Sequence, residues 1–169
     1  RWARSYALYV LAYAAWSEGD AARARELLLD CLTCAHTFHD LLGSVLSIEL
    51  LALVTVAQGD ASEAALLQGA AASLWPSVGL PLFGSAYYNA PHELCEATVR
   101  ERLGDERYEE YVRQGRALGR EAAVARALGR TRPLDGLPAP RESVRPAEVS
   151  RDMQRPAASP TRKGGETAG

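Results

Sequence analysis

The sequence predicts an all-α protein, built as a solenoid of helical hairpins, on three observations. Apolar residues recur at helical spacing over long stretches, and 47% of the 169 residues are apolar, which is enough for a core. A Gly-Asp pair follows three of these stretches, at Gly19-Asp20, Gly59-Asp60 and Gly104-Asp105. Gly can adopt the left-handed conformation that ends a helix, and the following Asp can accept hydrogen bonds from the first N–H groups of the next helix. The first two pairs stand forty residues apart, a period typical of helical-hairpin repeats.

The composition divides the chain near residue 129. Residues 1–129 have the helical periodicity, with 11 basic and 16 acidic side chains, and we expect them to form one helical-repeat domain. Neither an initiator Met nor a helix cap precedes Trp2, so we expect this domain to be truncated at its N-terminus. Residues 130–169 hold six of the nine prolines and no helical period, which predicts a disordered Pro/Arg-rich tail. Nucleic-acid binding by this tail is an alternative, although five acidic residues dilute its eight basic ones.

Periodicity and capping residues together place seven helices in residues 1–129. Trp75-Pro76 should end the fourth helix, because proline lacks the backbone donor that a helix needs. An irregular loop at 77–90 should follow, anchored by Phe83, Tyr87 and Tyr88. The predicted helices span Trp2–Trp16, Asp20–Ala35, Asp40–Ala57, Asp60–Leu74, Pro91–Leu103, Asp105–Leu118 and Arg120–Leu128.

The third predicted helix, Asp40–Ala57, is apolar almost all round. It is shorter than the roughly 20 residues of a membrane span, and Glu49 near its centre would cost about 2.5–3.5 kcal/mol in lipid. We therefore interpret it as the central helix of the solenoid, contacted on several sides. The pattern leaves open whether Glu49 pairs with an arginine or faces a groove.

The first predicted helix has an aromatic stripe, which is the candidate interaction surface. Its residues recur at spacings of four and three, so they share one face of the helix. Packing between helices explains such a stripe, and a peptide-binding wall is the alternative. We expect the stripe to contact a preceding repeat in the intact protein. Its members are Trp2, Tyr6, Tyr9, Tyr13 and Trp16.

The candidate metal ligands are Cys31, Cys34, His36 and His39, a Cys-x-x-Cys followed by two histidines. On a continuous helix Cys31 lies within the apolar stripe, and His36 points roughly 140° away from it. We therefore expect buried cysteines and loop histidines, with zinc binding and redox chemistry as alternatives. His92 and Cys95 share a face of the fifth predicted helix, with no evident partner nearby.

No pattern of catalytic or cofactor-binding residues is present in the sequence. A Walker A motif is absent, since Lys163 is the only lysine and its context does not fit. No nucleophile elbow is found. Three cysteines give no disulfide framework, which favours a reducing, cytoplasmic compartment, and no signal peptide is visible. We expect a protein without enzymatic activity and without a cofactor.

Several segments resemble a known family. They are Ala64–Leu74 (AALLQGAAASL), 78–81 (VGLP), 102–108 (RLGDERY), 114–118 (QGRAL) and 121–128 (EAAVARAL). Together they resemble the end of the tetratricopeptide-like helical region in large bacterial regulators of the signal-transduction ATPase class. That class includes LuxR-type and SARP/AfsR-type transcriptional regulators with a central P-loop ATPase.

The resemblance implies a tetratricopeptide-like sensing or scaffolding arm, tied to an ATPase and a DNA-binding domain elsewhere in the polypeptide. Because these residues have no Walker A motif and no helix-turn-helix follows Leu128, neither ATP binding nor DNA binding is assigned to them. We expect a protein partner, either upstream domains of the same polypeptide or a regulatory partner, with no direct nucleic-acid binding and no membrane contact. A helical-repeat adaptor unconnected to transcription is the alternative, and a small enzyme or metalloprotein is a third.

Overall fold

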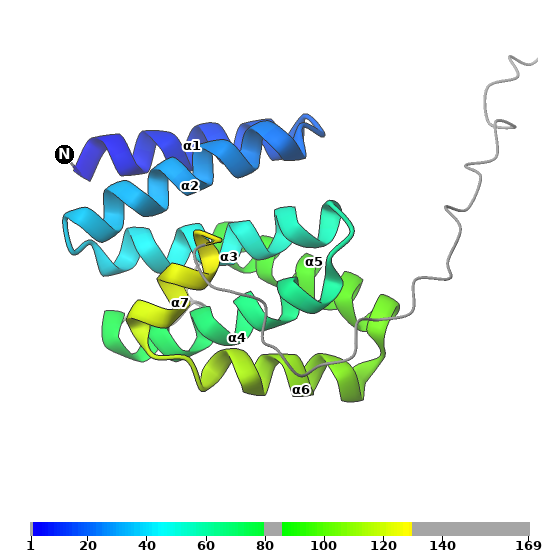
Figure 1. Cartoon of the computed structure of the whole chain (residues 1–169). Coiled ribbons are helices and arrows are strands. Elements are labelled where there is room, and N and C mark those ends of the chain that lie inside the picture. Colours follow the sequence, from blue (N-terminus) through cyan, green and yellow to red (C-terminus); the bar gives the residue numbers. More distant parts are fainter. Residues whose placement is uncertain (1, 80–85, 130–169) are drawn as a thin grey trace, which may run out of the picture. The chain divides into compact units, whose positions relative to one another are not determined.

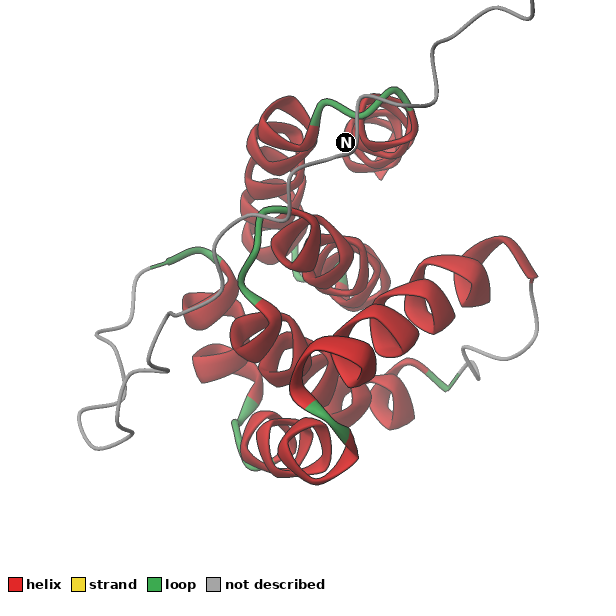
Figure 2. Ribbon diagram, turned by 90° about the vertical axis from the view of Figure 1, so that its right-hand side faces the viewer, coloured by secondary structure: helices red, strands yellow, loops and turns green. Residues whose placement is uncertain are grey.

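The chain is helical throughout the part that the structure describes. The computed structural model describes residues 2–79 and 86–129, which contain seven helices and no strand (Figures 1 and 2). The all-helical prediction is thereby confirmed, and a solenoid of hairpins is compatible with it. The helices are α1 (Trp2–Ser17), α2 (Ala21–Thr37), α3 (Leu41–Ala57), α4 (Ala61–Val78), α5 (Ala86–Leu103), α6 (Asp105–Arg116) and α7 (Arg120–Ala127).

Neighbouring helices pack in pairs along the chain. α1 packs against α2 and α3 against α4, and α2 also packs on α3, so that the second pair continues the first (Figure 1). The third pair is less regular, because α6 lies mainly against α4 while α5 contacts both α3 and α4. The short helix α7 packs on α4 and touches α2 and α3.

The first four helices end in the same way, at intervals of twenty residues. Each of these helices is followed within two residues by a residue whose positive φ reverses the chain. These residues are Gly19 (85°), His39 (55°), Gly59 (103°) and Gly79 (73°). The aspartate after each of the first three is the N-cap of the next helix and accepts a backbone N–H at 2.9 Å. These bonds run from Arg23 to Asp20, from Gly43 to Asp40 and from Glu63 to Asp60. The predicted caps at Asp20 and Asp60 are confirmed.

The predicted set of Gly-Asp corners needs one addition and one correction. His39-Asp40 takes the role that the sequence analysis gave only to Gly-Asp pairs, and His39 is the one non-glycine residue with a positive φ among those described. At the third Gly-Asp pair, Gly104 is the N-cap and has no side-chain hydrogen bond. Asp105 is already helical there and accepts instead from Arg100 at 3.0 Å.

The boundaries of α4 and α5 were predicted wrongly, because both helices run through a proline. α4 continues past Pro76 to Val78, and Trp75 donates to Glu49 at 2.9 Å, which fixes its last turns on α3. α5 begins at Ala86, so Pro91 lies inside it, with its ring buried against the body. Packing thus offsets the one backbone hydrogen bond that each proline removes. The expected anchor Phe83 and the predicted tail at 130–169 lie outside the described residues, as do the side chains of Tyr87 and Tyr88.

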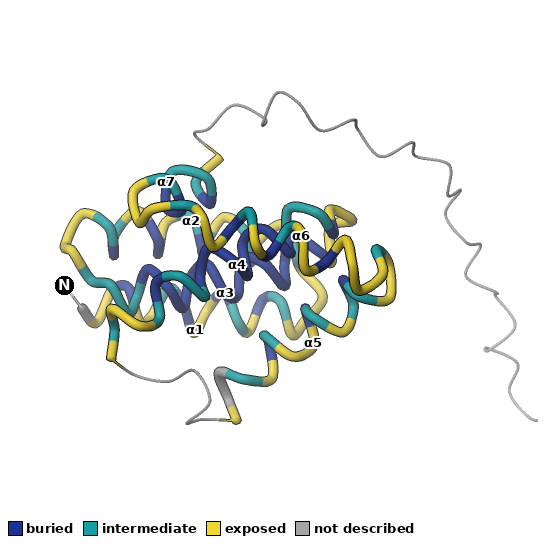
Figure 3. The backbone as a smooth tube through the Cα atoms, turned by 90° about the horizontal axis from the view of Figure 1, so that it is seen from below, coloured by how far each residue is buried: buried dark blue, intermediate teal, exposed yellow. Residues whose placement is uncertain are grey.

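α3 is the central helix, as predicted. All its residues from Ser44 to Val56 are buried, and Figure 3 shows it as an almost continuous dark-blue segment. It contacts α1, α2, α4 and α5 and, more lightly, α7. α4 and α6 cross closely because each has a glycine at the crossing. A Cβ at Gly69 would overlap the carbonyl group of Val112, and one at Gly115 would overlap that of Leu66.

Candidate interaction surface

The predicted aromatic stripe of α1 is divided between the interior and the solvent. Tyr9 is buried in the core, while Tyr13 and Trp16 are half-buried and meet edge to face with their ring centres 5.9 Å apart. Tyr6 is 49% exposed. Trp2 lies in the helix, but its side chain is not among those described. The described part of the stripe therefore serves mainly to hold α1 on the helices beneath it.

A second apolar face of α1 points to solvent, and sequence reasoning missed it. No charged residue occurs from Ser5 to Ser17, so no side of the helix is marked as the solvated one. The absence of charge beside the stripe was the signal that could have revealed this face. We call it the outer face of α1, and it consists of the exposed residues Ala3, Tyr6, Ala7, Val10, Leu11 and Ala14.

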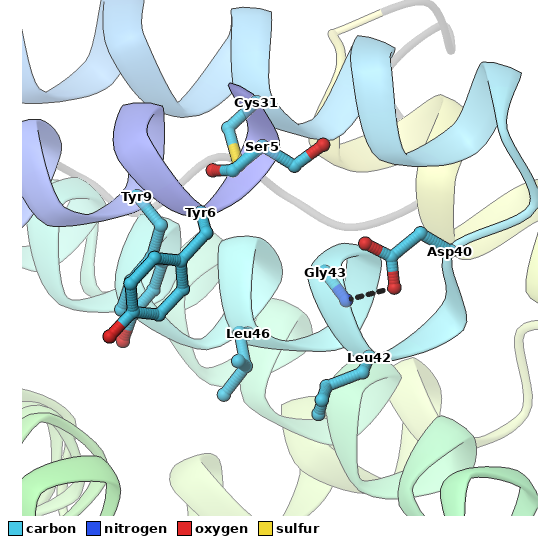
Figure 4. A pocket seen from close by; sticks show the side chains of 8 residues that line it. All are labelled: Ser5, Tyr6, Tyr9, Cys31, Asp40, Leu42, Gly43 and Leu46. Carbon is cyan, nitrogen blue, oxygen red and sulfur yellow. Dashed lines mark hydrogen bonds between the residues drawn. The ribbon is translucent and has the colours of Figure 1, made fainter. Parts of the chain in front are cut away.

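A small cavity opens beside the outer face, between α1, α2 and the start of α3 (Figure 4). Tyr6 and Tyr9 line it from α1, with Leu42 and Leu46 opposite them on α3. Its volume is about 70 Å³, far below the ≈ 300–1,000 Å³ of sites for drug-sized ligands. Its one carboxylate, that of Asp40, already caps α3 through Gly43. The cavity is therefore a gap at the edge of a helix interface, large enough for a few atoms.

The cysteines of the candidate metal cluster bind neighbours inside the fold. The Cys31 thiol donates to the Ser5 carbonyl oxygen at 3.1 Å and accepts from the Ser47 hydroxyl at 3.2 Å. Burial raises the pKa of the Cys31 thiol, and the Ser47 hydrogen bond offsets this only in part. Cys34 accepts from the Ser5 hydroxyl at 3.4 Å. Cys31 is thus a protonated thiol that joins α2 to α1 and α3.

The two histidines of that cluster point elsewhere. His36 Nε2 lies 3.6 Å from a carboxylate oxygen of Glu121 on α7, and His39 forms the corner before α3. Within residues 2–79 and 86–129, no three His, Cys, Asp or Glu side chains gather in a way that could hold a metal ion.

Glu49 is the one charged side chain buried in α3, and it is held by partners from two other helices. One of its oxygens accepts from the Trp75 indole and the other from Nδ1 of His92, each at 2.9 Å. The sequence showed no evident partner near His92, and the structure gives it one that lies 43 residues away in sequence. This arrangement joins α3, α4 and α5 at one buried point.

Further hydrogen bonds extend this buried polar network to α6. Gln68 donates to the His92 carbonyl oxygen at 3.0 Å and accepts from the Tyr108 hydroxyl at 2.9 Å. The guanidinium of Arg100 lies over the Tyr108 ring, 4.1 Å from its centre, and binds Glu96 at 2.8 Å. Because nearly every polar group here has a partner, the network is suited to fixing helix positions rather than to acting on a substrate.

The pKa of His92 is set by burial and by the carboxylates around it. Burial alone lowers the pKa of the imidazole, but the hydrogen bond and charge of Glu49, with Glu96 and Glu93 adding to them, outweigh it. The pKa of His92 is therefore raised above its usual value of 6.5. Glu96 also lies 3.7 Å from Nε2 of the same ring.

The curated proteins that this chain resembles share one name. The chain is similar to curated proteins of Mycobacterium bovis and Mycobacterium tuberculosis named "Putative HTH-type transcriptional regulator", with 32% identity over 126 residues. The similarity covers 75% of this chain but only 14% of each relative's length. No family model matches the chain, and no solved structure matches it. The chain is thus similar to one segment of much longer proteins that carry this name.

The described helices also bear on membrane contact. None of them combines the length and the hydropathy needed to cross a bilayer. α3, the most apolar, has Glu49 near its middle.

Proposed function

We propose that residues 1–129 form a non-catalytic helical-repeat module that serves protein interaction and sensing within a bacterial transcriptional regulator. The observation that carries the proposal is the similarity of three quarters of the chain to one segment of large HTH-type regulators. The twenty-residue spacing of helix ends supports a repeat architecture, which commonly provides an extended binding surface. The tetratricopeptide-like arm of a regulator with a P-loop ATPase is the finer form of this proposal.

In this proposal the DNA reader and any ATPase lie in other parts of the polypeptide, and the module contacts protein. The excess of acidic over basic side chains in residues 1–129 makes them a poor surface for nucleic acid. The outer face of α1, which includes Tyr6 of the aromatic stripe, is the surface we assign to a protein partner. We place the module in the cytoplasm, where a transcriptional regulator works and where its three free cysteines stay reduced.

The test compares the 169-residue chain with the intact polypeptide that its reading frame encodes. We expect the intact polypeptide to retard promoter DNA in a gel-shift assay and the 169-residue chain to leave the same DNA unshifted. Deleting residues 1–129 from the intact polypeptide should keep DNA binding but abolish the response of a transcription reporter to its signal. DNA retardation by the 169-residue chain, or a reading frame with no DNA-binding domain, would contradict the proposal; the second result favours an adaptor.

A further inference from the structure

The first two hairpins repeat with an offset of forty residues, so each position of α1 has an equivalent on α3. The corners at Gly19 and Gly59 have the same hydrogen bonds in the same order. The aspartate N–H after each glycine reaches five residues back, Asp20 to Ala15 at 2.9 Å and Asp60 to Thr55 at 3.2 Å. Position n of α1 can therefore be compared directly with position n + 40 of α3.

One set of equivalent positions is buried in both helices. These positions repeat every three or four residues and face the rest of the fold. The pairs are Ser5 and Val45, Tyr9 and Glu49, Ala12 and Ala52, and Ala15 and Thr55.

The other set is exposed on α1 and buried on α3, and it includes every outer-face residue except Ala3, whose equivalent Gly43 is half-buried. Arg4, at the edge of this face, is also exposed where its equivalent Ser44 is buried. Ala7 and Ala14 are exposed, for example, whereas their equivalents Ser47 and Val54 are buried. The large side chains show the contrast most clearly: Tyr6 49% against Leu46 8%, Val10 40% against Leu50 0%, and Leu11 55% against Leu51 1%. α1 thus has an apolar face at the positions that α3 buries.

On α3 the equivalent face is covered by the preceding hairpin, mainly by α2. Near the start of α3, a Cβ on Gly43 would lie 3.2 Å from the Cβ of Ala35 on α2. One turn further, the Ser47 hydroxyl donates to the Cys31 thiol at 3.2 Å. The contacts move backwards along α2 as they move forwards along α3, so the two helices are antiparallel. Small residues on α3 allow this close approach.

We infer that the outer face of α1 is the docking surface for another helical hairpin of the same repeat, positioned ahead of α1 in the intact polypeptide. Its second helix lies antiparallel along α1 as α2 lies along α3, opposite the small residues Ala3 and Ala7, which are equivalent to Gly43 and Ser47. The occupant is an amphipathic helix with small or apolar residues where α2 has Cys31 and Ala35. Continuity with the α2–α3 interface carries this inference, which rests on the repeat architecture of the proposed function. In the relatives the matched segment is 14% of the length, so their remaining residues are more than enough to form such a hairpin.

The test compares the 169-residue chain with a version extended by the forty residues that its reading frame encodes ahead of Arg1. The variant is Leu11→Gln, and its matched control is Leu94→Gln on α5, a leucine of similar exposure at 47%. In the 169-residue chain, both substitutions should shift the melting temperature by less than about 2 °C, since both leucines are at the surface. In the extended chain, Leu11→Gln should lower it by about 4 °C or more, while Leu94→Gln still has little effect.

A labelling experiment gives a second measurement that does not require a destabilised variant. Ala7→Cys should react rapidly with a thiol reagent in the 169-residue chain and at least about tenfold more slowly in the extended chain, as expected for a covered site. The inference would be overturned if Leu11→Gln lowered the melting temperature equally in both chains and Ala7→Cys were labelled at the same rate in both. It would also be overturned if the residues encoded ahead of Arg1 did not form a helical hairpin. Dimerisation of the 169-residue chain that Leu11→Gln abolishes and that persists in the extended chain would identify a second copy as the occupant instead. Because stability and labelling do not depend on transcription, an adaptor protein would overturn the proposed function and leave this inference intact.

Discussion

The close crossing of α4 and α6 makes a specific prediction about two glycines. Gly69 is buried in the middle of α4, and Gly115 is buried in the last turn of α6. Inside a helix glycine is otherwise unfavourable by about 1 kcal/mol relative to alanine, and by less near a helix end. A methyl group at Gly69 would meet the Val112 carbonyl, and one at Gly115 would meet the Leu66 carbonyl. Both obstacles are backbone atoms, so the clash is relieved only if one helix moves away from the other.

The size of the effect follows from two opposing contributions. Overpacking a tight site costs about 1–3 kcal/mol, and a rigid backbone obstacle favours the upper part of that range. The better helix propensity of alanine returns up to about 1 kcal/mol. We therefore expect Gly69→Ala and Gly115→Ala each to lower the free energy of unfolding by about 1–2 kcal/mol. The double variant should lose less stability than the two single variants added together, because the helix separation that admits the first methyl group also makes room for the second.

Urea unfolding followed by far-UV circular dichroism measures both effects, with the slope m reporting whether the transition stays two-state. The control is Gly119→Ala, since Gly119 has a φ of −71° and nothing lies within 4 Å of its added Cβ. It should change the free energy of unfolding by no more than about 0.5 kcal/mol. If Gly69→Ala were as stable as the wild type or more so, helix propensity would dominate and the close crossing would not constrain the sequence.

Three further predictions concern single side chains. Because the pKa of His92 is raised on folding, its contribution to stability should be complete below its unfolded value of 6.5 and lost as the pH rises through the folded value. The free energy of unfolding, measured by urea titration at a series of pH values, should fall in this way for the wild type. It should depend less on pH in His92→Gln, in which Glu49 keeps a neutral partner, and the same pH dependence in both proteins would contradict the prediction. His39→Gly should raise the free energy of unfolding by about 0.5–1 kcal/mol, because a φ of 55° strains any residue with a Cβ, and an unchanged urea midpoint would refute this. Arg126→Ala should cost about 1 kcal/mol and speed amide exchange in α7, since Arg126 binds both carboxylate oxygens of the partly buried Glu63, at 2.9 and 2.6 Å.

The local features of the fold were predictable from the sequence because they depend on neighbours within a few residues. Asp20 and Asp60 cap helices through the N–H three positions ahead, and a preceding glycine supplies the reversal. His39 was missed because a non-glycine residue with positive φ has no reliable pattern. Pro76 was wrongly predicted to end the fourth helix and Pro91 to begin the fifth. Only the packing around each proline decides whether the helix continues through it, and a local pattern does not report that packing.

Contacts between distant segments were the part that the sequence did not reveal. Nothing in the sequence marks Gly69 and Gly115 as a crossing point, because only the fold places Gly69 against the Val112 carbonyl and Gly115 against the Leu66 carbonyl. Glu49 and His92 are separated by 43 residues, so nothing local to either identifies the other as its partner. Both cases depend on how the third helix pair departs from the regular stacking of the first two.

The candidate surface shows the same limit from another direction. Spacing located an aromatic stripe on α1, but spacing reports only which side chains share a face, not whether another helix covers that face. From Ser5 to Ser17 α1 has no charged side chain, and α3 has only Glu49, so the two helices have the same pattern of a helix contacted on several sides. In the described residues α3 meets that expectation and α1 does not, because Tyr6, Val10 and Leu11 face solvent. The hairpin inferred to precede α1 would account for a helix that has the composition of an interior element and a partly exposed surface. The outer face, which includes only Tyr6 of the stripe, is therefore where a partner should be sought.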